Sequence, residues 1–386
     1  MRTYLDNAAT SFPKPEPVYA AVERYQRELG TAHGRATTRS ASEVQRVIDR
    51  CRSRAARLFG AQRPEQVLFS FNGTDALNLA LHGLLRPGDR AVATVWEHNS
   101  VLRPLRELQE RIGIDVDTIG SDGNGRLDLD ELEGALNADT RLVVVTHASN
   151  VTGIIQPVEE VVRLAHDHGA LVLLDAAQTS GHFPVRMSEL GVDLIATPGH
   201  KGLLGPLGTG LLVIRPGLER ELQPIREGGT GTTSESDRQP DTLPERYEPG
   251  NHNVPGLFGL EAALQWHEEQ GPLAEKTEPE LELLQQLSSG LAAMSGVTVV
   301  LNDDTLPRVA MLSIVCDRIE PQVLASLLDQ HFSIETRAGL HCAPLAHREL
   351  GTLENGGTVR FSLGPFTTST EIDATLEAMA QITAAM

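Results

Sequence analysis

Residues 171–201, LVLLDAAQTSGHFPVRMSELGVDLIATPGHK, decide the fold of this 386-residue chain. Two short apolar runs, LVLL at the start and LIA near the end, have the length of buried strands. Asp175 directly follows the first run, and Lys201 follows the second in a loop rich in glycine and proline. The interval of 26 positions (201 − 175) leaves room for one helical crossover and one strand. In a doubly wound sheet both side chains then lie at neighbouring strand ends, where such sheets bind ligands.

The same alternation extends over residues 60–215. Further strand candidates are QVLFS, RAVATV, RLVVVTHAS and GTGLLVI, and helical patterns such as GTDALNLALHGLL and VEEVVRLAHDHG lie between them. This order predicts βαβ units and a mostly parallel sheet covered by helices. From about residue 255, long helical patterns accompany the strand candidates VTVVL and VAMLSIVC, which predicts a smaller α+β unit.

The composition excludes several classes of protein. A formal net charge of −19 argues against a nucleic acid or an anionic membrane surface as partner. The one basic stretch, RVIDRCRSRAARLFG at residues 46–60, has helical spacing, and we interpret it as a solvated helix face. No apolar run approaches the roughly 20 residues of a membrane span, and the amino terminus lacks the apolar core of a signal peptide. Three cysteines fit a reducing, cytoplasmic compartment.

Lys201 lies in a nearly chargeless stretch, ATPGHKGLLGPLGTGLLVI at residues 196–214. Apolar surroundings desolvate an amine and lower its pKa, and a neutral lysine amine is a nucleophile that forms Schiff bases. A surface lysine on a turn is the plain alternative. If Lys201 is reactive, we expect the glycines around it to let a cofactor approach the backbone closely.

Asp175 needs a cationic partner, because a carboxylate at the end of a buried strand is costly by itself. A protonated heterocyclic nitrogen would supply one. The stretch NGTDALNLA places Gly73, Thr74 and Asp75 at a helix start, where backbone N–H groups hold phosphates, although ordinary helix capping accounts for the same residues. A lysine, an acid and phosphate donors together are what a pyridoxal phosphate site requires.

Seven stretches together resemble the class V aminotransferase family, in its cysteine desulfurase and selenocysteine lyase branch. The resemblance implies the type I pyridoxal phosphate-dependent transferase fold, an α/β fold with a mostly parallel seven-stranded sheet. It assigns residues 17–255 to a large domain, residues 1–16 with 256–386 to a small α+β domain, and implies a homodimer with the active site at the subunit interface. The stretches are YLDNAATSFPKP, NGTDALNLA, EHNS, SNVTG, DAAQTSGH, GHKGLLGPLGTGLL and RAGLHCAPLAH.

The resemblance also implies a role for each polar residue at the strand ends. Lys201 bonds covalently to pyridoxal 5'-phosphate, and Asp175 pairs with its pyridine nitrogen. Arg360 grips the carboxylate of the substrate, which suits the two-pronged geometry of a guanidinium. His98 stacks on the ring face and is counted with Lys201 and Asp175 as catalytic, and Asn150 lies near the ring and the substrate. The other cofactor contacts are Thr74, Asp75, Gln178, Thr197 and His200.

Cys342 in RAGLHCAP decides between reactions. The resemblance implies a desulfurase in which the Cys342 thiolate attacks the sulfur of L-cysteine, and L-alanine leaves. The resulting persulfide passes to a sulfur-acceptor protein or a reductant. Arg337 and His341 are placed to favour the thiolate. A selenocysteine lyase, or an aminotransferase or β-lyase without a persulfide step, remains an alternative, and we expect Cys51 and Cys316 to be structural.

Two positions depart from the family pattern. Leu340 stands where the branch usually has the first of two histidines, so His341 is the histidine that remains before the cysteine. Asn251 and His252 in EPGNHNVPG replace the residues that the family commonly uses to reach the phosphate of the other subunit. We therefore assign no such contact to them.

Overall fold

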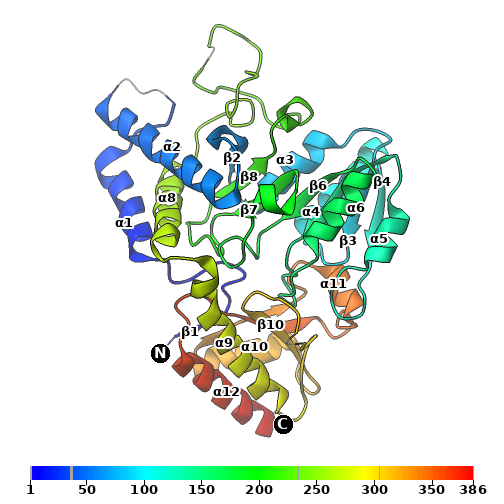
Figure 1. Ribbon diagram of the computed structural model, residues 1–386. Coiled ribbons are helices and arrows are strands. Elements are labelled where there is room, and N and C mark those ends of the chain that lie inside the picture. The colour runs from blue at the N-terminus through cyan, green and yellow to red at the C-terminus, as the bar shows by residue number, and fades with distance from the viewer. Residues whose placement is uncertain (1, 35–37, 233, 304, 386) are drawn as a thin grey trace.

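The computed structural model of the protein describes residues 2–34, 38–232, 234–303 and 305–385. Its upper part contains a seven-stranded sheet with the order β2-β8-β7-β6-β5-β3-β4 (Figure 1). Among these seven strands β8 alone runs antiparallel to its neighbours, so the predicted, mostly parallel sheet is confirmed. The strands are β2 (Val67–Ser70), β3 (Arg90–Thr94), β4 (Asp115–Ile119), β5 (Thr140–Thr146), β6 (Leu171–Asp175), β7 (Leu194–Pro198) and β8 (Gly210–Ile214).

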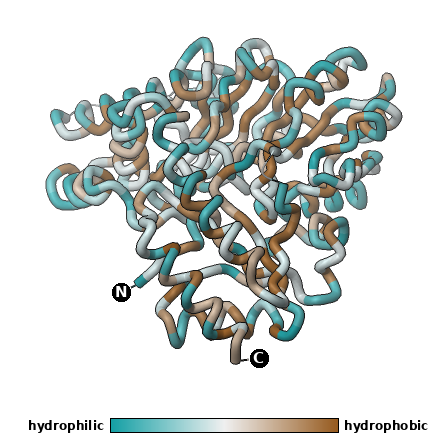
Figure 2. The backbone as a smooth tube through the Cα atoms, turned by 60° about the horizontal axis from the view of Figure 1, so that its bottom comes forward, coloured by the Kyte–Doolittle hydropathy of each residue, from teal (hydrophilic) through white to brown (hydrophobic). Residues whose placement is uncertain are grey.

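Helices cover both faces of this sheet, because successive strand side chains point to opposite faces and are apolar on both. Val143 and Val145 of β5 belong to one core, and Leu142 and Val144 of the same strand belong to the other. Figure 2 shows the strands as hydrophobic segments inside a more hydrophilic shell. The first core is closed by α2 (Arg39–Phe59), α5 (Leu129–Ala135), α6 (Val158–Asp167) and α8 (Val254–Glu269), and the second by α3 (Gly73–Leu84) and α4 (Asn99–Ile112).

The basic stretch at residues 46–60 forms the last two thirds of α2, and three of its arginines pair with glutamates of α8. Arg50 and Arg54 contact Glu261 Oε1 at 3.2 and 3.1 Å, and Arg57 contacts Glu268 Oε1 at 2.8 Å. The stretch does form a helix, but its face is only partly solvated, because Arg52 is buried against Glu248 and Arg54 is mostly covered by α8.

The lower part contains an antiparallel sheet with the order β12-β13-β10-β9, which confirms the predicted α+β unit. β1 (Thr3–Tyr4) pairs with β11 (Ile334–Glu335), so both ends of the chain lie in this part (Figure 1). The other elements are β9 (Val297–Val299), β10 (Met311–Cys316), β12 (Arg337–Gly339), β13 (Thr358–Ser362), α9 (Leu273–Ala292), α10 (Pro321–Phe332), α11 (Pro344–Glu349) and α12 (Ser369–Ala384).

The division of the chain at residues 16 and 255 stays a prediction. Helix α8 begins at Val254 and lies along α1 (Glu16–Arg24) and α2, beside the large sheet (Figure 1).

The short helix α7 (Met187–Leu190) lies between β6 and β7 in the sequence. Among the described residues, no helix combines the length and the hydropathy needed to cross a lipid bilayer.

Candidate active site

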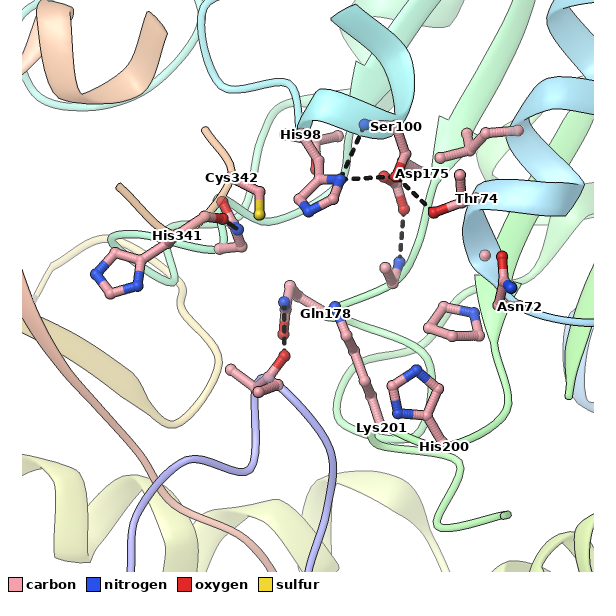
Figure 3. A pocket seen from close by; sticks show the side chains of 18 of the residues that line it. Asn72, Thr74, His98, Ser100, Asp175, Gln178, His200, Lys201, His341 and Cys342 are labelled. Carbon is pink, nitrogen blue, oxygen red and sulfur yellow. Dashed lines mark hydrogen bonds between the residues drawn. The ribbon is translucent and has the colours of Figure 1, made fainter. Parts of the chain in front are cut away.

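The carboxyl ends of the central strands open into a cavity with about 860 Å³ of empty volume, part of it open to solvent. Side chains from both sheets converge on it (Figure 3). All predicted site residues except Asp75 and Thr197 line this cavity. The lining members are Thr74, His98, Asn150, Asp175, Gln178, His200, Lys201, Cys342 and Arg360.

Asp175 ends β6 and is 4% exposed. Its Oδ1 accepts a hydrogen bond from Ala177 N at 2.9 Å. Burial raises the pKa of Asp175, whereas this N–H group and the charge on Lys201 act in the opposite direction. In the part of the chain that the structure describes, no cation forms an ion pair with this carboxylate. The carboxylate of Asp175 is therefore free to pair with a cationic group bound in the cavity.

Lys201 lies half-buried in the loop between β7 and β8. Burial lowers its pKa to about 8; Arg360 and Arg337 act in the same direction, and Asp175 opposes them. An amine with this pKa is partly neutral near physiological pH, and the neutral form is the nucleophile. The lowered pKa therefore supports the interpretation of Lys201 as a reactive lysine rather than a surface lysine on a turn.

The glycines beside Lys201 serve the packing of the chain on itself. A Cβ atom at Gly199 would lie 2.2 Å from Thr209 Oγ1, and one at Gly202 would lie 2.3 Å from Ser180 O. Both clashes are with neighbouring protein atoms. Packing within the chain therefore already requires glycine at these two positions, and the close approach of a cofactor to this loop stays a prediction.

His98 caps α4 and presents a neutral ring to the cavity (Figure 3). Its Nδ1 accepts a hydrogen bond from Ser100 N at 3.0 Å, which assigns the ring proton to Nε2. Burial lowers the pKa of His98 to about 4, and the charge on Lys201 adds to the effect. A neutral, planar ring is suited to stacking on a flat cofactor.

Ser100 is a site residue that our sequence analysis missed. Its Oγ lies 2.6 Å from Thr74 Oγ1 and 2.8 Å from His98 Nδ1. Thr74 and Ser100 lie in the first turns of α3 and α4, where backbone N–H groups lack helical partners and favour an anion. The signal was present in EHNS, because a hydroxyl two residues beyond His98 enters the first helical turn.

Asp75 and Thr197 face away from the cavity. Asp75 Oδ2 accepts a hydrogen bond from Phe71 N at 2.9 Å and lies 3.3 Å from Arg226 Nη2, so its carboxylate is used at the start of its own helix. Thr197 is fully buried, and its hydroxyl donates to Ala176 O at 3.5 Å. Neither side chain lines the cavity, and their contact with a cofactor stays a prediction.

Arg360 is buried on β13 and held from two sides. Its Nη1 donates to Asn150 O and its Nη2 donates to Asp6 Oδ1, both at 2.9 Å, whereas Nε has no partner in the described structure. Burial lowers the pKa of Arg360 and Asp6 opposes this, yet a guanidinium keeps its charge at physiological pH. Arg337 lies opposite Arg360 in the β12–β13 ladder and adds a second positive charge to the cavity.

Cys342 is exposed, in the loop between β12 and α11. His341 and Cys342 both have left-handed backbone conformations, with φ of 48° and 59°, which are costly for residues other than glycine. Two hydrogen bonds hold this loop: Asn150 Nδ2 donates to His341 O at 2.6 Å, and Asn99 N donates to Cys342 O at 2.7 Å. The thiol is thereby kept at the cavity (Figure 3).

His341 supplies no positive charge to this thiol. Its Nε2 lies 2.9 Å from Thr358 Oγ1 in a buried position, and burial lowers its pKa well below the usual value. A neutral imidazole does not favour a thiolate by charge, so the expected support from a positive His341 is wrong. Arg337 is the cationic candidate that remains.

Cys51 and Cys316 are 0% and 9% exposed. Burial raises the pKa of both thiols, that of Cys316 to about 11. A buried thiol that holds its proton is a poor nucleophile. The expectation that these two cysteines are structural is confirmed in this respect.

Polar atoms without partners show that the cavity fits a polar ligand. Asn150 Oδ1, His200 Nδ1 and Arg360 Nε are buried, and none has a partner among the described residues. Leaving such atoms unpaired is costly, so a molecule with several polar groups suits the cavity. The amine of Lys201, the carboxylate of Asp175 and the hydroxyls at two helix starts match the aldehyde, ring nitrogen and phosphate of pyridoxal phosphate.

Comparisons with known proteins find relatives over nearly the whole chain. Residues 3–375 match the sequence family described as aminotransferase class-V. A probable cysteine desulfurase of Methanothermobacter thermautotrophicus is 35% identical over 383 residues, covering 98% of this chain and 94% of that protein. A cysteine desulfurase of Escherichia coli is 31% identical over 387 residues, covering 98% and 93%. The apo structure of a cysteine desulfurase from Thermococcus onnurineus NA1 has a TM-score of 0.91 at 31% identity, covering 100% and 95%.

Proposed function

The chain belongs to the class-V aminotransferase family, and from this premise we infer that it is a pyridoxal phosphate-dependent cysteine desulfurase. It converts L-cysteine to L-alanine, and Cys342 receives the sulfur as a persulfide. The observation that carries this proposal is one cavity that joins the amine of Lys201, the buried carboxylate of Asp175 and the exposed thiol of Cys342. An aminotransferase needs the first two groups and has no use for the third.

Different residues around the cavity bind different parts of the cofactor in this proposal. When bound, pyridoxal phosphate withdraws electrons from the amino group of the substrate and makes the adjacent C–H bond acidic. Asp175 would keep the ring nitrogen protonated, because none of the described residues supplies its buried carboxylate with another cation to pair with. We assign Lys201 to the covalent link, His98 to the ring face, Gln178 to the ring oxygen, and Thr74, Ser100 and His200 to the phosphate.

Arg360 binds the carboxylate of L-cysteine in this proposal. Its terminal nitrogens are oriented by Asp6 and by the backbone of Asn150, and Nε and the remaining N–H groups are left for the substrate. A guanidinium held in this way offers two parallel hydrogen bonds without having to be ordered first. The side-chain oxygen of Asn150 is also free to accept a hydrogen bond.

Lys201 and Cys342 carry out the proton and sulfur transfers. Once the substrate has displaced it, Lys201 accepts the α-proton of L-cysteine at Nζ. The Cys342 thiolate then attacks the sulfur of the substrate: an S–S bond forms and the C–S bond breaks. The electron pair of the broken bond stays on Cβ, which takes up a proton. Lys201 returns the α-proton from Nζ to Cα, so L-alanine leaves with both C–H bonds in place.

The test is an assay of alanine and sulfide released from L-cysteine in the presence of a reductant, with Cys342→Ala in parallel. We expect equimolar alanine and sulfide from the parent enzyme and loss of both in the variant. Pyruvate or a transaminated product, or a variant that matches the parent, would instead support the aminotransferase or β-lyase alternative. Turnover of L-selenocysteine by the Cys342→Ala variant would support a selenocysteine lyase.

We propose that the enzyme is a homodimer. Phe71, Leu207 and Ile225 are 43%, 65% and 39% exposed, and we place these apolar side chains in the contact with the second copy. Phe71 precedes α3, whose first turn carries Thr74, so a contact there would lie close to the cavity. Light scattering should give a molar mass twice that of the chain, and a single-chain mass would contradict the proposal.

A persulfide on an exposed Cys342 is within reach of a second protein. We therefore propose a sulfur-acceptor protein as its recipient, with a reductant as the simpler alternative. A reactive thiol also requires a reducing compartment, which favours the cytoplasm. Transfer of labelled sulfur from the enzyme to candidate acceptor proteins would test this step directly.

A further inference from the structure

Glu97 is a fully buried carboxyl group that the proposed mechanism does not use. It lies between β3 and α4, one residue before His98, and is 0% exposed. Its Oε1 accepts hydrogen bonds from Thr94 Oγ1 and from Thr146 N, both at 2.8 Å. Its Oε2 has no partner in the part of the chain that the structure describes. An ionised carboxylate left in this state would be far more costly than a neutral acid.

Glu248 is a buried glutamate of this chain whose ionised form is stabilised by hydrogen bonds and by neighbouring positive charge. Arg52 donates two hydrogen bonds to it at 2.8 Å, Phe69 N donates at 2.7 Å, and His252 Nε2 lies at 3.0 Å. Burial pushes the pKa of Glu248 up, but Arg52 and His252 outweigh this and lower it to about 2. Glu97 has no such cation, and burial raises its pKa to about 8.

The charged group that faces Glu97 is Asp175. Thr146, whose N–H group bonds to Glu97, is the register partner of Asp175 in the β5–β6 ladder. The negative charge on Asp175 adds to the effect of burial on the pKa of Glu97, and the other partners, Thr94 and Thr146, are uncharged. The repulsion between two desolvated carboxylates disfavours the state in which both are ionised. Burial raises the pKa of Asp175 as well, but Ala177 N and the charge on Lys201 act in the opposite direction, and Glu97 has no cation of this kind among the described residues.

We propose that Glu97 is a positioning residue that keeps its proton at neutral pH, so that Asp175 alone presents a negative charge to the ring nitrogen of the cofactor. Its carboxyl group ties β3 to β5 beside His98 without adding a second charge to the site. The effect on the cofactor rests on the proposed function. The proton itself is a property of the chain without cofactor.

Unfolding of the cofactor-free protein tests the proton. Between about pH 5 and pH 8 the native state holds a proton that the unfolded chain has released, so stability falls as pH rises. Glu97→Gln removes this cost, and its Tm relative to the parent should increase steadily over that range. The matched control is Glu261→Gln, which removes a glutamate paired with Arg50 and Arg54 and should show no such increase. A Tm difference for Glu97→Gln that does not change with pH would overturn the proposal.

Infrared spectroscopy of the parent chain provides a second test, which does not depend on the folding of a variant. The carbonyl band of a neutral carboxylic acid should be present at pH 7 and weaken as the pH passes about 8. Absence of that band at pH 7 would overturn the proposal.

The absorbance of the reconstituted enzyme tests the link to the cofactor. Titrations of the cofactor bound through Lys201 should coincide for the parent and Glu97→Gln at neutral pH and diverge above about pH 8, where the parent gains a second negative charge. Titration curves that already differ at neutral pH would show an ionised Glu97 and overturn the proposal. If the stability and infrared results hold while the parent releases no sulfide from L-cysteine, the proposed function fails and the proton on Glu97 stands.

Discussion

Asn150 donates from Nδ2 to the carbonyl oxygen of His341 at 2.6 Å, and its own backbone oxygen accepts from Arg360 Nη1 at 2.9 Å. One residue therefore connects the arginine that we assign to the substrate carboxylate with the loop that carries Cys342. His341 and Cys342 have left-handed conformations, so this loop keeps its shape only while hydrogen bonds hold it. Asn99 N, which donates to Cys342 O at 2.7 Å, holds the other end.

Removing the side chain of Asn150 should separate sulfur transfer from cofactor binding. Asn150→Ala deletes a hydrogen bond worth about 1 kcal/mol and frees the Cys342 loop, so we expect release of sulfide to fall by about fivefold to tenfold while the cofactor still binds. The matched control is Asn99→Ala, because Asn99 holds the loop through its backbone N–H. Equal losses in the two variants would contradict the role of the Asn150 side chain.

The three cysteines should differ sharply in reactivity. Iodoacetamide should label Cys342 in the native protein, because this thiol is exposed, whereas Cys51 and Cys316 should react after denaturation. Mass spectrometry of tryptic peptides measures the three sites separately. Native labelling of Cys51, which lies in the core between α2 and the sheet, would contradict the structure at that point.

The rate at which the cofactor-free enzyme bonds covalently to pyridoxal phosphate should depend on pH through Lys201. Burial lowers the pKa of this amine from 10.5 to about 8, and the neutral form reacts, so the rate should rise as pH increases through about 8. In Arg337→Met a positive charge that favours the neutral amine is gone, and the midpoint should move upward. Stopped-flow absorbance measures both rates. A parent midpoint near 10.5 would contradict a desolvated amine.

The Arg52–Glu248 pair should be among the most sensitive points for stability. Arg52→Met leaves a buried carboxylate without its cation, and we expect a loss of about 3–5 kcal/mol in the free energy of unfolding, measured with urea at neutral pH. The double variant with Glu248→Gln should lose less, because no charge is stranded. A double variant as unstable as Arg52→Met would contradict this account.

The same pair sets an acid limit on stability. The folded pKa of Glu248 lies at about 2, below that of the unfolded chain, so its contribution is complete above the unfolded pKa of about 4.5 and is lost as pH falls toward 2. Urea unfolding of the parent and of Glu248→Gln should therefore converge as the pH is lowered. Curves that stay equally far apart at about pH 3 and pH 7 would contradict the shift.

The large sheet was predictable because its evidence is local. Strand β6 is a continuous apolar run that ends in Asp175, and β7 repeats the arrangement shortly before Lys201. A carboxylate and an amine at the ends of buried strands are chemically unusual wherever they occur, so both could be selected from the sequence. Ser100 was missed because its position is ordinary for a helix start, and its bond to Thr74 joins two helices that are separate in the sequence.

The roles of Asp75, Gly199 and Glu97 depended on contacts between distant segments. Asp75 forms an ion pair with Arg226, and a Cβ atom at Gly199 would clash with the side chain of Thr209. Glu97 appears in the sequence as an ordinary acidic residue before His98. Its lack of a cation becomes visible once β5 and β6 are placed beside it.

The sequence by itself determined the order of strands and helices, the two ends at which a carboxylate and an amine meet, and the cysteine that distinguishes a desulfurase from an aminotransferase. The first two follow from hydrophobic periodicity and side-chain chemistry, which are properties of short segments, whereas the cysteine was singled out by the resemblance to the class V aminotransferase family. The tertiary structure decided which of the polar residues face the cavity, which charges are matched inside the chain and which carboxyl group keeps its proton. Those outcomes depend on desolvation and on the distance to the nearest opposite charge, and both exist only after remote segments have packed together.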